Sequence, residues 1–98
     1  MSTRIVTFVD VNVAADREQE LLDGFRQMNE GSKPRGLLRS ELLRGQNGEW
    51  RIQTVWRDMD ALMAVRNSGK PPAALALLDS LGAEHSHALF TVEQSYDA

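Results

Sequence analysis

The first strand-like stretch, residues 4–13, has bulky apolar side chains on both of its faces. Successive side chains of a β-strand point to opposite faces of the sheet, so residues of the same parity lie together. One face carries Ile5, Val9, Val11 and Val13. The other face carries Val6 and Phe8. An antiparallel sheet with one face in water alternates between apolar and polar residues along each strand. This stretch therefore predicts a sheet that is covered on both sides.

A helix is predicted to follow this strand. Asp16 and Gln19 have the spacing of an N-cap carboxylate and its partner in the first turn, close to a capping box. The apolar stripe of the helix consists of Leu21, Leu22, Phe25 and Met28. Gly31 is placed to end the helix, and residues 32–36 have the composition of a loop.

Two further strand-like runs, residues 37–44 and 49–56, are separated by the sequence Gly-Gln-Asn-Gly. Asn and Gly tolerate the positive φ angles of a tight turn, so the two runs predict a β-hairpin. One face of the second run carries Trp50, Ile52, Thr54 and Trp56.

Two short helices are predicted next. Asp58 is placed to cap the first of them, residues 59–67, which carries Leu62, Met63 and Val65. Pro71 or Pro72 suits the first turn of the second helix, which stops at Gly82.

A last strand-like run, residues 84–94, completes the order β-α-β-β-α-α-β. A central hairpin with helical crossovers on either side is the ferredoxin-like arrangement, so we predict an α+β fold with a four-stranded antiparallel sheet and helices on one face. Phe90 and Val92 then point away from the face of Leu89, and bulky side chains remain on the uncovered face. Loops and the C-terminal tail are the alternative cover, but the tail after Gln94 is short. We therefore expect a homodimer, in which two sheets pair into a dimeric α/β barrel.

Length and composition bound the class of protein. The 98 residues predict a single domain, 1–98. A net charge of −3 argues against nucleic-acid binding, which needs a clustered basic face. The nearest approach to such a cluster is Lys33, Arg35, Arg39 and Arg44.

The absence of cysteine excludes disulfides and thiolate chemistry. Asp10 comes too early for a signal peptide, and the apolar run at residues 71–78 is too short to span a membrane. We expect a cytoplasmic protein that does not bind membranes.

The hairpin and its flanks resemble a known family. The segments concerned are residues 36–44 (GLLRSELLR), 50–56 (WRIQTVW) and 58–62 (DMDAL), with 72–75, 82–84 and 90–92 also fitting. Together they are similar to the antibiotic biosynthesis monooxygenase family over essentially the whole chain. The resemblance implies a dimeric α/β barrel made by two ferredoxin-like protomers. It does not fix the reaction, because the family mixes monooxygenases, haem-degrading enzymes and members of no known activity.

The resemblance places Trp56 at a cavity between the helices and the sheet. There its indole can stack on an aromatic substrate or donate a hydrogen bond, and anchoring a helix to the sheet is a compatible role. Apolar lining of the same pocket is predicted from Leu21, Phe25 and Leu62. Hydrogen bonds to a ligand are predicted from Asn12, Arg66 and Tyr96, each of which is otherwise a surface residue.

His85 and His87 lie two residues apart on a strand and therefore share a face. A His-x-His pair can bind a metal ion, but a site needs a third ligand, the chain has no other histidine, and Glu93 lies too far along the strand. We therefore predict no metal site. His85 can instead act as a general base, and the alternative is a pair of polar side chains at the exposed start of the strand.

No cofactor is predicted. The chain has no glycine-rich phosphate loop and no Ser-His-acid spacing, so flavin and nicotinamide binding are unsupported. Haem-degrading members of the family resemble one another in a first-strand Asn, and in a Trp and an axial His after the third strand. Here the strand position is Val9, and residues 58–82 contain neither Trp nor His. Haem binding is therefore not expected.

Two functions remain. The first is a cofactor-independent monooxygenase that acts on an aromatic or polyketide-like molecule. The deprotonated, electron-rich ring of the substrate passes an electron to O₂, while the protein supplies an apolar pocket, a base and a few hydrogen bonds. The second is a non-catalytic dimeric protein of the same fold with a binding or structural role, which the small number of polar candidates favours.

Overall fold

The structure is a computed structural model that describes residues 3–69 and 73–98. Its strands are β1 (Ile5–Asn12), β2 (Leu37–Arg44), β3 (Glu49–Trp56) and β4 (His85–Thr91). Its helical elements are the 3₁₀ turn η1 (Ala15–Arg17) and the helices α1 (Glu18–Met28), α2 (Met59–Arg66) and α3 (Ala73–Ser80). This order confirms the predicted ferredoxin-like α+β fold. Pro71 and Pro72, predicted to begin the last helix, lie outside the described residues.

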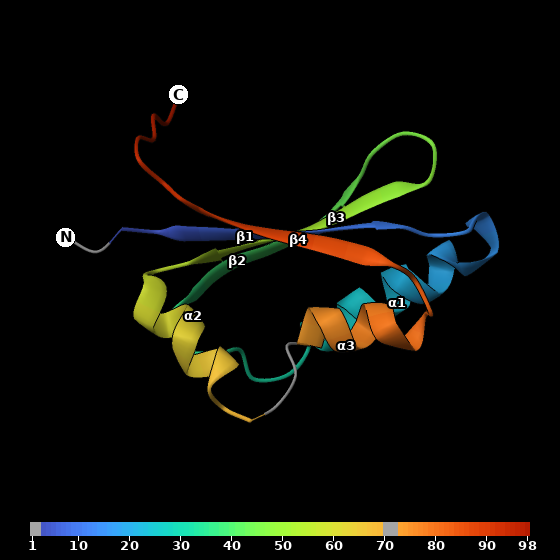
Figure 1. Ribbon diagram of the computed structural model, residues 1–98, viewed down its shortest axis with the longest axis horizontal. Helices are drawn as coiled ribbons and strands as arrows, with labels where there is room; N and C mark the ends of the chain where they lie inside the picture. Colours follow the sequence, from blue (N-terminus) through green and yellow to red (C-terminus); the bar gives the residue numbers. More distant parts are fainter. Residues whose placement is uncertain (1–2, 70–72) are drawn as a thin grey trace.

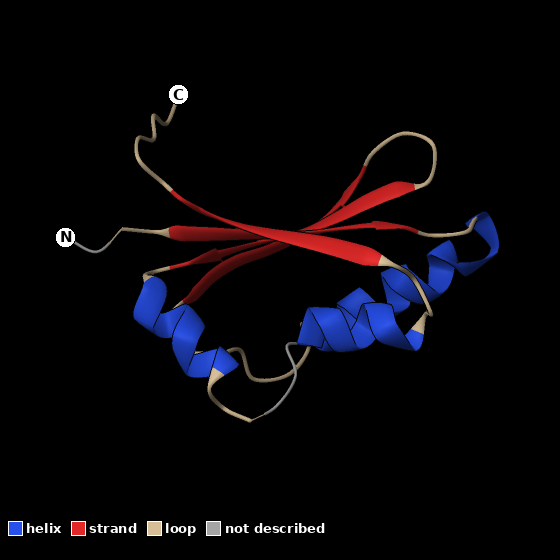
Figure 2. Ribbon diagram, in the orientation of Figure 1, coloured by secondary structure: helices blue, strands red, loops and turns tan. Residues whose placement is uncertain are grey.

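The strands form one antiparallel sheet in the order β2-β3-β1-β4. The three α-helices lie on the same side of this sheet (Figures 1 and 2). The C-terminal segment and the β2–β3 loop extend toward the other side (Figure 1). We call the side with the helices the covered face and the other side the open face. No helix in the described part of the chain has the length and apolar character needed to cross a membrane.

The hairpin between β2 and β3 forms as predicted. Asn47 and Gly48 both have positive φ angles, 58° and 81°. The backbone N–H of Gly45 donates to the carbonyl of Glu49 at 2.8 Å and closes the loop. The Asn-Gly pair therefore fixes where the two strands turn, and with it their register.

Helix α2 starts at the predicted cap. The Asp58 carboxylate accepts a hydrogen bond from the backbone N–H of Ala61 at 2.8 Å. This bond, together with the neighbouring Arg57 guanidinium, holds the pKa of Asp58 below its usual range. The cap fixes the point at which the chain leaves β3 and enters α2.

The predicted cap of α1 is wrong. Asp16 lies inside η1, and α1 begins at Glu18 without any side-chain cap. The helix also ends at Met28, before Gly31. Directly after Met28, the Asn29 side chain donates a hydrogen bond to the carbonyl of Phe25 at 2.8 Å. The amide of Asn29 thus satisfies a carbonyl at the end of the helix. The sequence predicts Gly31, instead of this amide, as the residue that ends the helix.

Cross-strand register sorts the covered face into rows of side chains. In order along the sheet they are Leu37–Trp56–Ile5–Thr91, Ser40–Thr54–Thr7–Leu89, Leu42–Ile52–Val9–His87 and Arg44–Trp50–Val11–His85. The first row packs against α2, and the last two rows pack against α1 and α3. The covered face therefore holds two separate apolar clusters, one at each end.

The larger cluster consists of Val9, Val11, Val13, Leu21, Trp50, Ile52, Leu78 and Leu81. The smaller cluster consists of Ile5, Trp56, Ala61 and Leu62.

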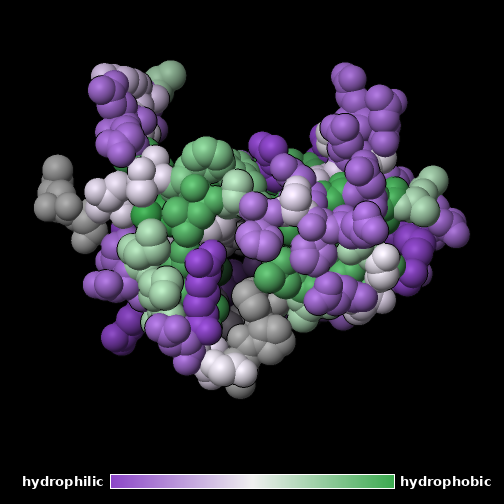
Figure 3. All heavy atoms as spheres, viewed as in Figure 1, coloured by the Kyte–Doolittle hydropathy of each residue, from purple (hydrophilic) through white to green (hydrophobic). Residues whose placement is uncertain are grey.

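Gly36 allows α2 to approach the start of β2, because it has φ of 87° and a side chain there would collide with Cβ of Ala61. Figure 3 shows an indentation of the surface between the α2 end and the α1–α3 end.

The open face has its own rows, which are Arg39–Val55–Val6–Phe90, Glu41–Gln53–Phe8–Ala88 and Leu43–Arg51–Asp10–Ser86. Phe8 and Phe90 pack edge to face with ring centres 5.6 Å apart, yet Phe90 remains 55% exposed. The C-terminal segment does not cover them, since residues 93–98 are all exposed. Within the described residues, this apolar corner has no cover.

Candidate functional site

Three hydroxyl side chains lie in one row between the two apolar clusters. Ser40, Thr54 and Thr7 come from β2, β3 and β1 and are direct cross-strand neighbours. Each is half-buried, and none of the three hydroxyls has a hydrogen-bond partner among the described residues. We call these three residues the hydroxyl row. It can donate to, or accept from, a bound molecule at the middle of the covered face.

Trp56 borders the hydroxyl row at the end of β3. It is only 6% exposed and packs with Ile5 and Leu62 in the smaller cluster. Its indole Nε1 is buried and has no hydrogen-bond partner in residues 3–69 and 73–98. By contrast, the Nε1 of Trp50 donates to the Glu18 carboxylate at 3.1 Å. Because buried indole N–H groups usually find an acceptor, the free donor of Trp56 is the feature of this face that most needs explanation.

A hollow of about 800 Å³ lies between α1 and β2 on the same side of the sheet. Its walls include Leu22, Phe25, Asn29, Ser40, Leu42 and Trp50. Ser40 is therefore both one end of the hydroxyl row and part of the wall of this hollow. Phe25, predicted to contact a ligand, lies in the hollow, whereas Leu62 lies in the cluster around Trp56.

His85 lies at the far end of the covered face from Trp56. Trp56 pairs with Ile5 and His85 pairs with Val11, six residues further along β1, which is roughly 20 Å. The Nε2 atom of His85 lies 3.1 Å from a carboxylate oxygen of Asp79, and its Nδ1 is buried without a partner in the described part of the chain. The structure does not bring these two predicted catalytic residues together.

His87 lies closer to the hydroxyl row than His85 does. It pairs with Val9 and precedes Leu89, the β4 member of the same row as Thr7, by two positions on the same face. It is exposed at the edge strand. Of the two imidazoles, His87 is therefore the one beside the middle of the covered face.

The remaining predicted ligand residues lie elsewhere. Asn12 is exposed on the open face, as the parity of β1 requires. Arg66 is exposed in the last turn of α2, and Tyr96 is 88% exposed in the C-terminal segment. None of these three side chains belongs to either apolar cluster.

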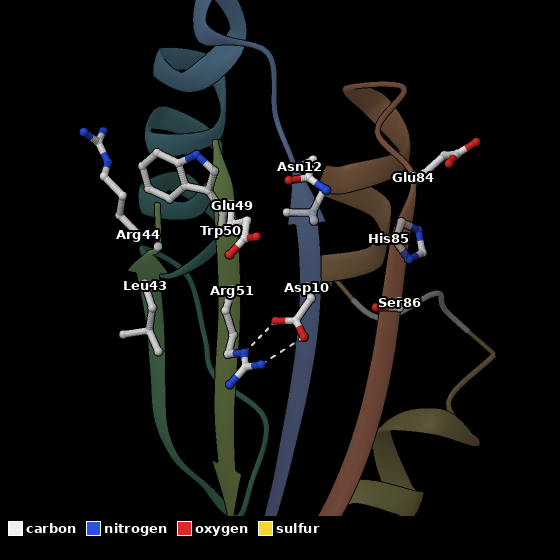
Figure 4. A pocket seen from close by; sticks show the side chains of 12 residues that line it. Asp10, Asn12, Leu43, Arg44, Glu49, Trp50, Arg51, Glu84, His85 and Ser86 are labelled. Atoms are coloured by element: carbon white, nitrogen blue, oxygen red, sulfur yellow. Dashed lines mark hydrogen bonds and ion pairs between the residues drawn. The ribbon is translucent and has the colours of Figure 1, made fainter. Parts of the chain in front are cut away.

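A second groove, with a volume of about 650 Å³, lies at the ends of the strands and is lined by residues of both faces. Figure 4 shows Asp10, Asn12 and Arg51 side by side there, with Ser86 and His85 on β4. The Arg51 guanidinium donates to both carboxylate oxygens of Asp10, one at 3.0 Å, and also lies over the Phe8 ring at 4.7 Å. The bonds from Arg51 hold the pKa of Asp10 below its usual range. Asp10 and Arg51 therefore satisfy each other in this groove.

In residues 3–69 and 73–98, no three His, Asp or Glu side chains lie together in an arrangement that could hold a metal ion. The free polar groups of the covered face include the indole N–H of Trp56, the three hydroxyls and the Nδ1 atom of His85, and the indole N–H and hydroxyls are good partners for ligand oxygens.

The fold and this site define a class of small α+β proteins in which helices cover one sheet face and leave a ligand-sized space against it. A sequence model of the family described as antibiotic biosynthesis monooxygenase matches residues 4–88. The chain therefore belongs to the antibiotic biosynthesis monooxygenase family. No curated protein matches the chain.

Solved structures show the same fold. A mutant of SnoaB, a cofactor-independent oxygenase from Streptomyces nogalater, is 21% identical with a TM-score of 0.65, over 94% of this chain and 95% of that one. A haem-degrading protein from Mycobacterium tuberculosis is 21% identical with a TM-score of 0.74, over 100% of both chains. A conserved protein from Methanosarcina mazei is 14% identical with a TM-score of 0.70, over 90% of this chain and 91% of that one. At these identities the likeness carries the fold, while the reaction has to be argued from the site.

Proposed function

We propose that this chain, as one domain of residues 1–98, is a small monooxygenase that acts on an aromatic or polyketide-like molecule without a metal or organic cofactor. The substrate lies on the covered face, against Trp56 and the hydroxyl row. Family membership and the oxygenase among the similar structures support the reaction class. The observation that carries the proposal is the buried indole N–H of Trp56, which has no acceptor among the residues that the structure describes.

The chemistry suits a site without a cofactor. In an anthrone-like substrate, a base removes a proton from the ring methylene, and the resulting carbanion passes an electron to O₂. One oxygen atom then becomes the new carbonyl oxygen, and the other leaves as water with the two methylene hydrogens. Because O₂ is the oxidant and the substrate supplies all the electrons, no external reductant is needed. The protein supplies an apolar surface and hydrogen bonds to the developing oxyanion.

The register supports a choice between the two histidines as the base. His85 is roughly 20 Å from Trp56 along the sheet, whereas His87 pairs with Val9, four residues from the Ile5 partner of Trp56, or roughly 13 Å. We therefore assign the base to His87 in place of His85. The pair is a matched test, since both imidazoles lie on the same face of β4.

Oxygen uptake with anthrone, in the absence of added metal and flavin, measures the activity. We expect His87→Ala to lower kcat by about 100-fold or more and His85→Ala to leave it within twofold. Trp56→Phe keeps an aromatic ring but removes the donor, and we expect about a tenfold loss of kcat/KM. Trp50→Phe, which removes the N–H bonded to Glu18, is its control. If the wild-type protein consumes no oxygen across a broad panel of anthrones and quinols, the enzyme proposal is wrong.

A non-catalytic ligand-binding protein is the second candidate. It is favoured by the polar groups of the covered face, because neither the hydroxyl row nor Trp56 can serve as a base near neutral pH. This function predicts a rise in the unfolding temperature with anthrone or dithranol, but no oxygen uptake.

We also propose that the open face is covered by a second copy of the chain. An apolar corner of Val6, Phe8, Val55 and Phe90 supports this, because within the described residues no helix or tail lies over it. Two such faces packed together would bury the exposed Phe90 ring of each copy. The covered face is then left for the ligand.

A further inference from the structure

The turn between β2 and β3 is built around Asn47 followed by Gly48. The backbone N–H of Glu49 donates to the carbonyl of Gln46 at 3.1 Å and closes the turn. Asn47 and Gly48 have φ angles of 58° and 81°. A type I′ turn requires positive φ at both central positions, and Asn followed by Gly adopts it most readily. The hairpin therefore needs this pair for its backbone conformation.

The same two residues can react with each other, because the backbone nitrogen of a glycine can reach the side-chain amide of the asparagine before it. Once that nitrogen loses its proton, a C–N bond forms between it and the amide carbon. The amide nitrogen takes up a proton and leaves as ammonia. Water then opens the cyclic imide, and no oxidant or reductant is required.

The imide can open at either of its two C–N bonds. Opening at the new bond restores the main chain and gives aspartate. Opening at the original peptide bond gives isoaspartate, in which the main chain runs through the former side chain and is longer by a methylene. Both products carry a carboxylate where the protein had a neutral amide.

Both reacting groups are free at this position. Asn47 is exposed, and its loop extends away from the helices (Figure 1). Within the described residues, the amide of Asn47 makes no hydrogen bond and the backbone N–H of Gly48 donates to no acceptor. Gly48 also has no side chain that would crowd the amide carbon. The attack therefore breaks no hydrogen bond of either group.

The other three asparagines of the chain are Asn12, Asn29 and Asn67. In each case the backbone N–H of the next residue is already bonded to a carbonyl: Val13 donates to Gly48 at 3.1 Å, Glu30 to Gln27 at 3.2 Å and Ser68 to Val65 at 3.2 Å. Each of these following residues also carries a side chain. The fold therefore leaves the nitrogen free at one asparagine and engages it at the other three.

We propose that Asn47 is a modification site, at which the folded chain converts an amide into aspartate and isoaspartate without an enzyme. The proposal goes beyond the proposed function and does not depend on it, because it needs only the turn. The product places a new carboxylate next to Glu49 at the tip of the hairpin.

Isoaspartate changes the contact between the hairpin and the end of β1. The carbonyl of Gly48 accepts from the backbone N–H of Val13, which is buried in the larger cluster. An added methylene between residues 47 and 48 moves this carbonyl. We therefore expect the isoaspartate form to unfold about 4–8 °C below the fresh protein.

The test is to hold the folded wild-type protein in mildly alkaline buffer and to follow every asparagine by peptide mass spectrometry. Trypsin cuts after Arg44 and Arg51, so Asn47 is the only asparagine in residues 45–51, and the other three fall in separate peptides. Conversion of the amide to an acid raises the mass of the peptide. We expect Asn47 to convert at least about tenfold faster than any other asparagine, because the other nitrogens must first give up a hydrogen bond.

Two variants are the controls. Asn47→Gly removes the amide and suits the same turn, so its mass and its unfolding temperature should stay constant during the incubation. Asn47→Asp supplies the charge of the product without the longer main chain. Because aspartate also tolerates positive φ, this variant should unfold close to the temperature of the fresh wild-type protein.

Incubation in urea gives the rate for the unfolded chain. Conversion of the folded protein at Asn47 alone supports the proposal. A rate at Asn47 more than about tenfold below its rate in urea would show that the turn protects the pair, and would overturn the proposal. Equal conversion at every asparagine of the folded protein would overturn it too. Aged protein that contains isoaspartate but unfolds like fresh protein would overturn the expected effect on the contact with Val13.

Discussion

Both faces of the sheet carry apolar residues, but only the residues of the covered face are buried by helices. On the covered face, Ile5 and Ile52 pack against helices and are at most 2% exposed. On the open face, Phe90 is 55% exposed although it lies only one residue from Leu89 on the same strand. The difference shows that the chain folds around one face and leaves the other incomplete. Apolar residues on a strand can therefore serve the monomer or a partner, and only their parity distinguishes the two.

The polar groups of the two faces differ in whether they have hydrogen-bond partners. Asp10 and Arg51 on the open face are paired with each other, and the Arg51 guanidinium also lies over the Phe8 ring. The hydroxyl row and Trp56 on the covered face have no partners in the described structure. Paired charges suit a surface that meets another protein copy, while free donors suit a site that receives a ligand.

The largest expected effect is on the covered face. Leu21 in α1 is fully buried in the larger cluster, so Leu21→Ala should lower the free energy of unfolding by about 2–5 kcal/mol. Urea unfolding measures this loss. Leu38→Ala, at an exposed position of β2, is the control and should change the stability by less than about 0.5 kcal/mol. Equal losses at both positions would remove the distinction between core and surface.

The next effect is on the open face. Phe90→Asp places a charge in the apolar corner, which should weaken the proposed dimer by roughly 100-fold or more while the chain still folds. Sedimentation velocity at a series of protein concentrations measures this change. Tyr96→Asp, in the exposed C-terminal segment, should leave association unchanged. A dimer of undiminished strength in Phe90→Asp would show that the second copy does not bind through this face.

A smaller effect is expected where α2 meets the sheet. Gly36→Ala adds a methyl group that collides with Ala61 and forces a side chain into a left-handed backbone conformation, so we expect a loss of roughly 1–3 kcal/mol. Gly69→Ala has a similar positive φ but no atom within 4 Å of the added carbon, so it isolates the backbone contribution. Thermal unfolding of both variants gives the comparison, and equal losses would mean that the contact with α2 adds nothing.

The smallest effect concerns the charged pair of the open face. The pKa of Asp10 is lower in the folded state, so its contribution to stability is present above the unfolded-state pKa and is lost as the pH falls through the folded-state value. Because the pair is about half exposed, Asp10→Asn should cost less than about 1 kcal/mol near neutral pH. The difference from wild type should vanish in strong acid. Urea unfolding from pH 7 down to pH 2 tests this, and a difference that grows in acid would contradict it.

Local signals in the sequence predicted much of the fold. The Asn-Gly turn and the Asp58 cap each depend on a few adjacent residues, and both formed as predicted. The prediction failed at Asp16, where a 3₁₀ turn precedes the helix and takes up the residue meant to cap it. The two patterns look alike in sequence, because both place an acidic residue just before an apolar stripe.

The candidate site was harder to predict, because it depends on register between distant strands. Thr7 and Thr54 are recognisable as hydroxyls on apolar strand faces, but only the pairing of β1, β2 and β3 aligns them with Ser40. The distance between His85 and Trp56 could not be predicted from the sequence for the same reason. Parity shows which face a residue is on, whereas the position along that face requires the register.

The oligomeric state of the unmodified chain tests the difference between the two faces most directly. Multi-angle light scattering at micromolar concentration should give twice the 11.0 kDa mass of one chain. A mass of one chain at that concentration would contradict the proposal that a second copy covers the open face.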